Sequence, residues 1–111
     1  TGVRDYIHVV DLAKGHVCAL KYAAEHTGSE AINLGTGVGY SVLDIINSFE
    51  RSTGVKVPYV ITERRPGDVP SYYANPEKAA KLLNWRTEKT LDDMCRDTWA
   101  WQTKNPMGYD E

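Results

Sequence analysis

The sequence predicts a small α/β fold of α+β-like character, with about four helices and two or three short strands. Apolar residues recur at helical spacing in several segments, and capping signals stand at the start of most of them. The β-branched and aromatic runs are short and too few to build a full sheet. The 111 residues suffice for one domain, which we expect to span residues 1–111.

The chain starts with an extended run followed by a long amphipathic helix. Residues 6–10, YIHVV, are β-branched and aromatic, which predicts an extended segment. We expect the helix to begin at Asp11, to continue to about Glu25 and to be ended by Gly28. Its apolar positions recur at helical spacing: Ala13, Val17, Leu20 and Ala24.

A short strand, a glycine loop and a second helix are predicted next. Residues 31–34 predict a strand that leads into the loop at residues 35–39, GTGVG. Ser41 and Asp44 have the spacing of a capping box, so a helix should start there and end at Gly54. The buried stripe of this helix should be Val42, Ile45, Ile46 and Phe49.

The next segments combine a strand, a charged loop and a short helix. Residues 57–62 alternate weakly between apolar and polar and predict another strand. A charged, proline-containing loop follows at residues 63–70. Asn75 and Pro76 are typical of a helix N-cap and first helical position, so a short helix should run to about Leu83.

A last helix is expected after the connection that contains Trp85. Thr90 and Asp93 form a second capping-box pattern, and the helix should run to about Lys104, where residues 105–106, NP, stop it. Its side chains predict a broad apolar face: Leu91, Met94, Cys95, Trp99 and Trp101. The alternative use of the two tryptophans is a stacking platform for nucleic-acid bases.

Composition excludes several classes of function. The net charge is −2 and both signs are spread along the chain, so we expect neither a nucleic-acid nor a membrane partner. No segment approaches the ~20 apolar residues of a membrane-spanning helix, and we expect no signal peptide. Cys18 and Cys95 lie within helical apolar patterns. One disulfide between them is arithmetically possible, but we interpret them as buried thiols of a cytoplasmic protein.

The glycine loop resembles the opening of a dinucleotide-binding fingerprint. It would combine Gly35, Gly37 and a following helix, with Glu63 as a ribose ligand. The third glycine position is Tyr40, whose ring would obstruct the close packing of helix on strand, and Glu63 lies too far along the chain. We therefore interpret the loop as a tight turn and expect no cofactor to be bound by this chain itself.

Metal binding and nucleophilic catalysis find little support. His16 and Cys18 are two positions apart, so on a helix they point to different sides, whereas zinc needs three or four converging ligands. No Gly-x-Ser-x-Gly elbow occurs, and no lysine stands four residues after a tyrosine. We expect no metal site and no catalytic residue in this chain.

The arginines carry the strongest binding signal. Arg4 precedes an acid and an extended run, while Arg64 and Arg65 open a loop that also contains Asp68. An arginine holds its charge at physiological pH and forks onto phosphate oxygens, and a carboxylate accepts hydrogen bonds from sugar hydroxyls. This combination suits a nucleoside diphosphate. The alternative is that these arginines are ordinary solvated surface side chains.

Several motifs resemble known proteins. Residues 2–12, GVRDYIHVVDL, and residues 33–37, NLGTG, followed by Ser41, resemble extended short-chain dehydrogenase/reductases that act on nucleotide sugars. Three further segments resemble the UDP-galactose 4-epimerases, also called UDP-glucose 4-epimerases, in particular. They are residues 64–70, RRPGDVP, residues 72–75, YYAN, and residues 97–106. The resemblance covers essentially the whole chain. It implies the C-terminal substrate-binding part of such an enzyme, and the abrupt start at Thr1 agrees with a piece of a longer protein.

The resemblance implies a role for four residues. Arg4 matches the arginine that binds the diphosphate of a UDP-hexose, and Arg65 matches a second phosphate-side arginine. Asp68 matches the acid that holds the ribose hydroxyls. Tyr72 matches a position that lines the hexose pocket, where a large residue accompanies poor acceptance of N-acetylated sugars. The family's glycine-rich NAD motif and Tyr-x-x-x-Lys would precede this chain.

For the whole enzyme, the resemblance implies NAD-dependent epimerisation of UDP-glucose and UDP-galactose at C4, in galactose metabolism. A tyrosine base and NAD, both held by the missing N-terminal domain, would remove and return hydrogen while the sugar turns. That domain, the UDP-sugar and a second copy of the full-length enzyme are the expected partners, and this chain alone should be inactive. The alternatives are another nucleotide-sugar dehydratase, decarboxylase or epimerase, and a non-catalytic nucleotide-sugar-binding module.

Overall fold

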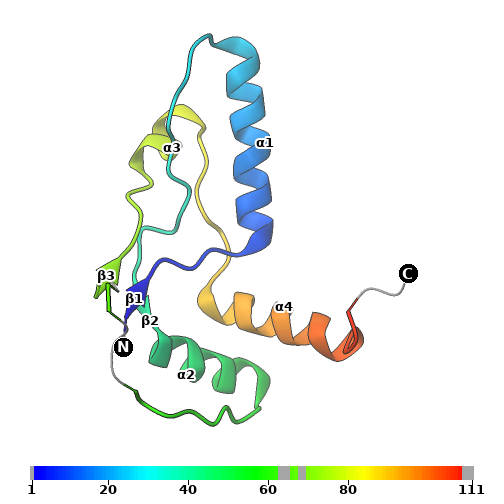
Figure 1. Cartoon of the computed structure of the whole chain (residues 1–111). Coiled ribbons are helices and arrows are strands. Elements are labelled where there is room, and N and C mark those ends of the chain that lie inside the picture. The colour runs from blue at the N-terminus through cyan, green and yellow to red at the C-terminus, as the bar shows by residue number, and fades with distance from the viewer. Residues whose placement is uncertain (1, 63–65, 68–69, 109–111) are drawn as a thin grey trace.

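The computed structural model describes residues 2–62, 66–67 and 70–108. Across these residues it contains helices and a three-stranded mixed sheet (Figure 1). The elements in chain order are β1 (Val3–Arg4), α1 (Val9–Glu25), β2 (Tyr40–Ser41), α2 (Val42–Thr53), β3 (Ser71–Tyr72), α3 (Glu77–Leu82) and α4 (Leu91–Lys104). This architecture confirms the predicted fold class.

The sheet joins three distant parts of the chain, with β1 as its central strand. β1 is antiparallel to β2, where Arg4 lies opposite Tyr40. It is parallel to β3, where Arg4 lies opposite Tyr72. One more backbone bond runs from the Val3 amide to the Pro70 carbonyl, at 2.9 Å, and holds the entry to β3 against β1.

One core lies between α1, α3 and the connection to α4. Its centre is Trp85, which is only 4% exposed and whose Nε1 donates to the Asp11 carbonyl at 3.0 Å. Gly15 lets α1 approach closely, because a Cβ at this position would lie 3.1 Å from the Trp85 ring. Ala79 and Leu83 complete the buried cluster. The half-buried residues around it are Ile7, Cys18, Ala19, Tyr22, Ile32 and Leu34.

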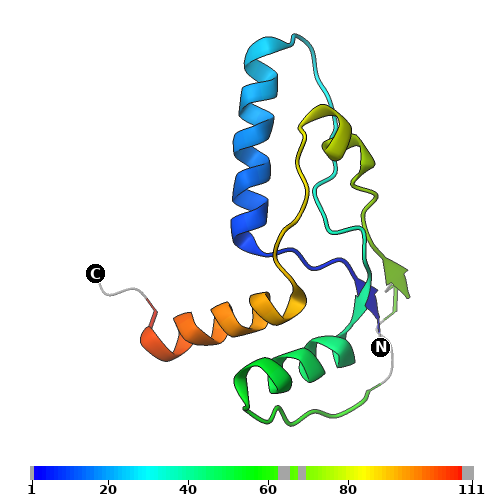
Figure 2. The same ribbon diagram turned by 180° about the vertical axis from the view of Figure 1, so that it is seen from behind.

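The second core lies between α2 and α4, which run side by side in both ribbon views (Figures 1 and 2). Leu91 and Cys95 are buried there. The rings of Phe49 and Trp99 meet edge to face, with centroids 5.6 Å apart. This packing confirms the predicted apolar face of the last helix at Leu91, Cys95 and Trp99, whereas Trp101, which was predicted to belong to it, is 43% exposed.

Both predicted capping boxes are confirmed. In α2 the Asp44 amide donates to Ser41 Oγ at 3.0 Å, and the Ser41 amide donates to Asp44 Oδ2 at 2.9 Å. Thr90 and Asp93 form the same reciprocal pair at the start of α4. Such caps satisfy backbone donors that the first helical turn leaves unpaired. The predicted end of α2 is also confirmed, since Gly54 caps it in the left-handed region at φ 74°.

The start of α1 differs from the prediction. The helix begins at Val9 and not at Asp11, because the His8 side chain caps it by accepting a bond from the Val10 amide at 3.0 Å. The expectation of an extended segment over residues 6–10 is therefore wrong at its last two positions. The strand that forms in this region is β1, earlier in the chain. At the other end the helix stops at Glu25.

The predicted strands at residues 31–34 and 57–62 do not form in the described chain. A strand needs a partner for its backbone hydrogen bonds, and neither segment pairs with a described one. Ile32 and Leu34 instead contribute to the Trp85 cluster. Val60 is 85% exposed and Ile61 73% exposed, so the second segment contributes no core side chains at these positions.

The short helix α3 starts close to its predicted position. The Asn75 side-chain oxygen accepts a bond from the Glu77 amide at 3.1 Å, as an N-terminal cap does. Pro76 is the residue before the helix and not its first member, and its carbonyl accepts from Ala80 at 3.1 Å. The helix ends at Leu82, one residue before the predicted end.

Candidate functional site

The sheet brings two of the predicted site residues together. Arg4 and Tyr72 are register partners on neighbouring strands, and such partners project from the same face of a sheet. Tyr40 is the register partner of Arg4 on the other side. The remaining two predicted residues, Arg65 and Asp68, lie outside the described residues. The two predicted site residues that the structure describes, Arg4 and Tyr72, are therefore adjacent in space.

Arg4 is the predicted phosphate ligand that the structure describes. The residue is half-buried, and its Nη1 donates to the Val3 carbonyl at 2.8 Å. Among the described residues, no carboxylate forms an ion pair with it. Tyr72 beside it is 69% exposed, so its ring is open to a ligand. This arrangement pairs a fixed positive charge with an accessible aromatic surface, which can bind phosphate on one side and a sugar on the other.

Asp5, directly after Arg4, organises the surroundings of the sheet. Its Oδ1 accepts from the Thr36 amide at 3.0 Å and from Thr36 Oγ1 at 2.7 Å. Its Oδ2 accepts from the Gly37 amide at 3.0 Å and from the Ala74 amide at 3.3 Å. These loop amides are committed to a carboxylate and are not free for a phosphate. Three amides of the glycine loop, at Thr36, Gly37 and Val38, are therefore unavailable to the phosphates of a dinucleotide.

Sequence reasoning missed Asp5 as an organising residue. Its three partner residues stand far from it along the chain, so no local spacing connects them. The available signal was an acid immediately beside the candidate phosphate arginine, Arg4. That signal alone does not show what the acid contacts.

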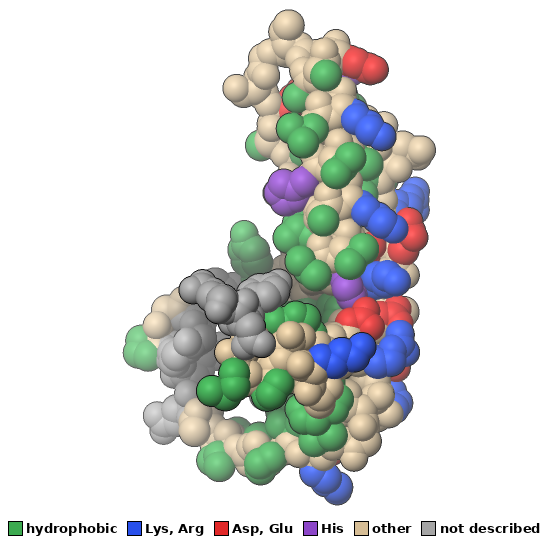
Figure 3. Space-filling model, turned by 90° about the vertical axis from the view of Figure 1, so that its right-hand side faces the viewer, with side chains coloured by type: hydrophobic (Ala, Val, Ile, Leu, Met, Phe, Trp, Pro, Cys, Tyr) green, Lys and Arg blue, Asp and Glu red, His purple; other side chains and the backbone are tan. Residues whose placement is uncertain are grey.

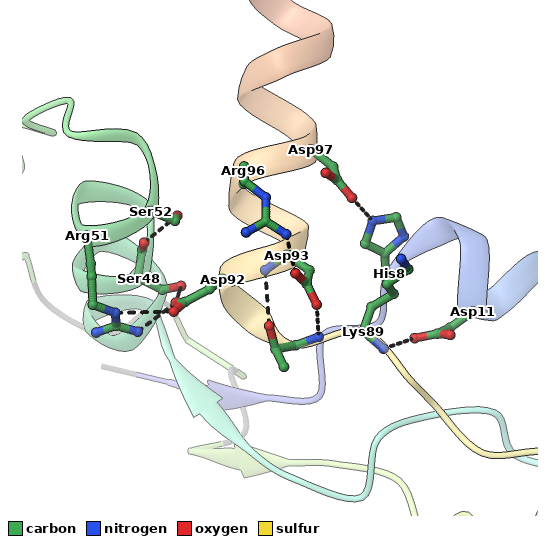
Figure 4. A network of polar contacts seen from close by, with 11 residues as sticks. His8, Asp11, Ser48, Arg51, Ser52, Lys89, Asp92, Asp93, Arg96 and Asp97 are labelled. Atoms are coloured by element: carbon green, nitrogen blue, oxygen red, sulfur yellow. Dashed lines mark hydrogen bonds and ion pairs between the residues drawn. The ribbon is translucent and has the colours of Figure 1, made fainter.

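A second polar pair joins α1 to α4 (Figure 4). His8 is 6% exposed, and its Nε2 lies 2.7 Å from Asp97 Oδ2. Because Nδ1 accepts from the Val10 amide, the ring proton belongs on Nε2, which donates to Asp97. The pair borders a hollow of about 500 Å³, lined by Ile7, His8, Val9, Met94, Asp97, Thr98 and Trp101.

A further polar network joins α2 to α4 (Figure 4). Arg51 Nη2 lies 2.6 Å from Asp92 Oδ1, and Ser48 Oγ donates to the same oxygen at 2.5 Å. The hydrogen bond from Arg51 and that from Ser48 lower the pKa of Asp92, and the same pairing with Asp92 raises the pKa of Arg51. The amide and hydroxyl of Thr90 lower the pKa of Asp93. These groups link α2 to α4 or cap α4, and Arg51, Thr90 and Asp92 line a hollow of which Arg4 is not a lining residue.

The described parts of the chain hold no group of three or more His, Cys, Asp or Glu side chains placed to bind a metal ion. Cys95 is buried and Cys18 is half-buried, and both are free thiols. No helix in the described ranges is long and apolar enough to cross a membrane.

Comparison with known proteins identifies relatives along nearly the whole chain. A family model described as GDP-mannose 4,6 dehydratase matches residues 1–98. The UDP-glucose 4-epimerase of Bacillus subtilis is 53% identical over 109 residues, which are 98% of this chain and 32% of that protein. The chain therefore spans about a third of the length of the curated relatives that it matches.

Solved structures of two such relatives share the fold. The Stenotrophomonas maltophila UDP-glucose 4-epimerase, with bound NAD and formylated UDP-arabinopyranose, gives a TM-score of 0.92 at 49% identity, over 96% of this chain and 32% of that one. The Bifidobacterium longum enzyme, in complex with NAD⁺ and UDP, gives 0.85 at 53% identity, over 98% of this chain and 32% of that one. The chain belongs to the GDP-mannose 4,6 dehydratase family of extended short-chain dehydrogenase/reductases, and it matches part of the UDP-glucose 4-epimerase fold.

Proposed function

We propose that this chain is the UDP-binding part of a UDP-glucose 4-epimerase. The observation that carries the proposal is the register of Arg4 beside Tyr72, which come from distant parts of the chain. In this proposal Arg4 binds the diphosphate and Tyr72 lines the hexose pocket. Arg65 and Asp68 lie outside the described residues. We propose that Arg65 is a second arginine on the phosphate side of the site and that Asp68 binds the ribose hydroxyls.

The chain's own contribution is to bind and orient. A fixed guanidinium anchors the diphosphate, so the hexose is presented at a constant depth while it stays free to turn. NAD, held by the rest of the enzyme, supplies the hydride chemistry. The glycine loop does not fit as an NAD site here, since the amides of Thr36 and Gly37 bond to Asp5. We therefore assign the cofactor to the two thirds of the enzyme that this chain does not cover.

An exposed apolar face on α1 supports the proposal that another part of the enzyme packs against this helix. Val9 is 71% exposed, Val17 51% and Leu20 72%, and hydrophobic side chains follow the length of α1 in Figure 3. The opposite side of the helix already packs on Trp85 through Gly15. A helix that is apolar on both sides is typically buried on both. We propose that the NAD-binding part of the enzyme covers this face.

The proposal that this face of α1 is covered in the whole enzyme can be tested on the 111-residue chain alone. Burial of apolar surface is worth about 25 cal/mol per Å², so leaving a few hundred Å² in water costs an amount comparable with the stability of a domain, about 5–15 kcal/mol. We expect the isolated chain to melt at low temperature or to self-associate in sedimentation velocity runs. A cooperative monomer that melts like an ordinary domain and binds UDP with micromolar affinity would contradict the proposal.

The activity itself is tested on the native protein. Its intact mass should be close to three times the 12.4 kDa of this chain, and it should interconvert UDP-galactose and UDP-glucose in a coupled assay. The isolated chain should show no turnover and retain no NAD. A native mass near 12.4 kDa would favour a non-catalytic nucleotide-sugar-binding module. Turnover of a different nucleotide sugar only would favour a related dehydratase, decarboxylase or epimerase.

Tyr72 is proposed to set the sugar selectivity. With its bulky ring at the hexose pocket, the enzyme should prefer UDP-glucose and UDP-galactose over their N-acetylated forms. Replacing it, Tyr72→Cys, should admit an N-acetyl group, measured as the ratio of kcat/KM for the two substrate types. The neighbouring substitution Tyr73→Cys serves as a matched control, since Tyr73 is not the register partner of Arg4. Equal turnover of both substrate types by the unmodified enzyme would contradict the proposal that Tyr72 sets the sugar selectivity.

A further inference from the structure

We propose that Asp5 is a positioning residue for the nucleotide-sugar site, because its carboxylate ties the glycine loop and the segment after β3 to the strand that carries Arg4. The ligand side of this inference rests on the proposed function. Its structural side concerns hydrogen bonds that exist without any ligand. Asp5 follows Arg4 directly, and Ala74 stands two residues after Tyr72.

Both oxygens of the Asp5 carboxylate are committed. Oδ1 takes two bonds from Thr36, at 3.0 and 2.7 Å, and Oδ2 takes one each from Gly37, at 3.0 Å, and Ala74, at 3.3 Å. The surroundings are tight, because a Cβ at Gly35 would lie 2.6 Å from Oδ2 and 2.7 Å from the Ala74 Cβ. Charge-assisted bonds of this kind are stronger than neutral ones. The carboxylate thus fixes how far the loop and the segment after β3 stand from β1.

The position of Tyr72 depends on this anchor. The strands β1 and β3 are two residues long each, and so short a ladder has little stability of its own. The start of β3 is held by the bond from Val3 to the Pro70 carbonyl. Its end is held by the bond from Ala74 to Asp5. Tyr72 lies between these two anchors and is largely exposed, so its own packing contributes little to its placement.

The test is Asp5→Asn in the native full-length protein. Asparagine offers one oxygen, so its NH₂ group must face either the Gly37 and Ala74 amides or the Thr36 amide, donor against donor. Without ligand, we expect hydrogen exchange at one or more of these three amides to accelerate roughly tenfold or more. With ligand, KM for UDP-galactose should rise about tenfold while kcat changes less than about threefold, because ground-state positioning is lost and the chemistry is not touched.

Asp11→Asn is the matched control. Asp11 also binds distant backbone amides, but only its Oδ2 is used, by Glu88 at 3.1 Å and Lys89 at 2.9 Å. Its Oδ1 has no hydrogen-bond partner, so an asparagine can keep both bonds and turn its NH₂ group to the unused side. We expect wild-type exchange at the Thr36, Gly37 and Ala74 amides and a wild-type KM in this variant.

A second variant separates geometry from charge. Gly35→Ala leaves Asp5 in place but inserts a Cβ where its carboxylate and Ala74 lie, so it should reproduce both effects of Asp5→Asn. If Asp5→Asn does not fold, Thr36→Val removes the hydroxyl bond to Asp5 and should give a smaller KM increase in the same direction.

The outcomes distinguish this inference from the proposed function. Unchanged amide exchange at Thr36, Gly37 and Ala74 in Asp5→Asn overturns the positioning role, whatever the protein binds. A fall in kcat at constant KM also overturns it, since that points to chemistry and not to placement. Absence of UDP-hexose binding by the wild-type protein overturns the proposed function and the ligand side of this inference together.

Discussion

The α2–α4 pair and the three-stranded sheet are held together by different means. The helix pair is a packed unit, with Leu91 and Cys95 buried and Phe49 against Trp99. The sheet consists of two-residue strands. The glycine loop and the segment after β3 are held to it by the side chain of Asp5. The contacts that join the two helices do not involve Arg4 or Tyr72. Substitutions there should therefore change stability, whereas substitutions at the sheet should change ligand affinity.

The strongest effect should be on the stability of the helix pair. Leu91→Ala removes a buried side chain at the start of α4 and should lower the free energy of unfolding by about 2–5 kcal/mol, through lost burial and a residual cavity. Urea denaturation of the purified protein measures this change. Val60→Ala, at an 85% exposed position, is the control and should change it by less than about 0.5 kcal/mol. Equal effects of the two variants would mean that the helix pair is not a packed core.

At the sheet, Arg4→Ala should act on binding. A lost charge-assisted bond to phosphate is worth about 1.5–3 kcal/mol, so kcat/KM for UDP-galactose should fall roughly 10- to 150-fold, mainly through KM. Arg65→Ala should behave in the same way, by the family resemblance. Arg86→Ala replaces an exposed arginine outside the sheet and should leave kinetics unchanged. Unchanged kinetics in Arg4→Ala would return this residue to the class of solvated surface arginines.

Loss of a helix cap is expected to have a moderate effect. Thr90→Ala removes the acceptor for the Asp93 amide and should lower the free energy of unfolding by about 1 kcal/mol, within a usual range of about 0.5–2 kcal/mol. Thr90→Ser keeps a hydroxyl at the cap and should recover most of the loss. Thermal melts of the three proteins at one concentration test this order. A KM change in Thr90→Ala would contradict the separation of helix pair and sheet.

The weakest effect should be a pH dependence of the helix pair. The pKa values of Asp92 and Asp93 are lowered below 3.8 in the folded protein, by bonds from Arg51 and from Thr90 respectively. Their stabilising contribution is therefore fully present above about pH 4 and is lost as the pH falls through the lowered folded values. Both carboxylates are at the surface, so added salt should weaken the effect.

Unfolding free energies between neutral and acidic pH, at low and high salt, measure this dependence. Asp92→Asn should flatten the acidic part of the curve, because this position no longer carries a carboxylate whose pKa differs between the folded and unfolded states. A stability that instead rises on acidification through this range would contradict the expected sign.

The helices could be predicted well from the sequence, because their signals are local. Ser41 with Asp44 and Thr90 with Asp93 predicted two helix starts, since a capping box is formed within four consecutive residues. The family resemblance indicated Arg4 and Tyr72 as site residues from motif matches alone. The start of α1 was placed two residues too late, because His8 is an uncommon cap and its side-chain bond is not evident from spacing.

The choice of which extended segments become strands depends on the folded chain as a whole. Residues 31–34 and 57–62 have strand-like composition but meet no described partner, whereas Val3–Arg4 becomes the central strand because segments from two other parts of the chain reach it. Strand formation depends on a partner that can lie anywhere in the sequence, while a helix satisfies its own backbone. The role of Asp5 was hidden for the same reason: its partners at Thr36, Gly37 and Ala74 become neighbours only in the folded chain.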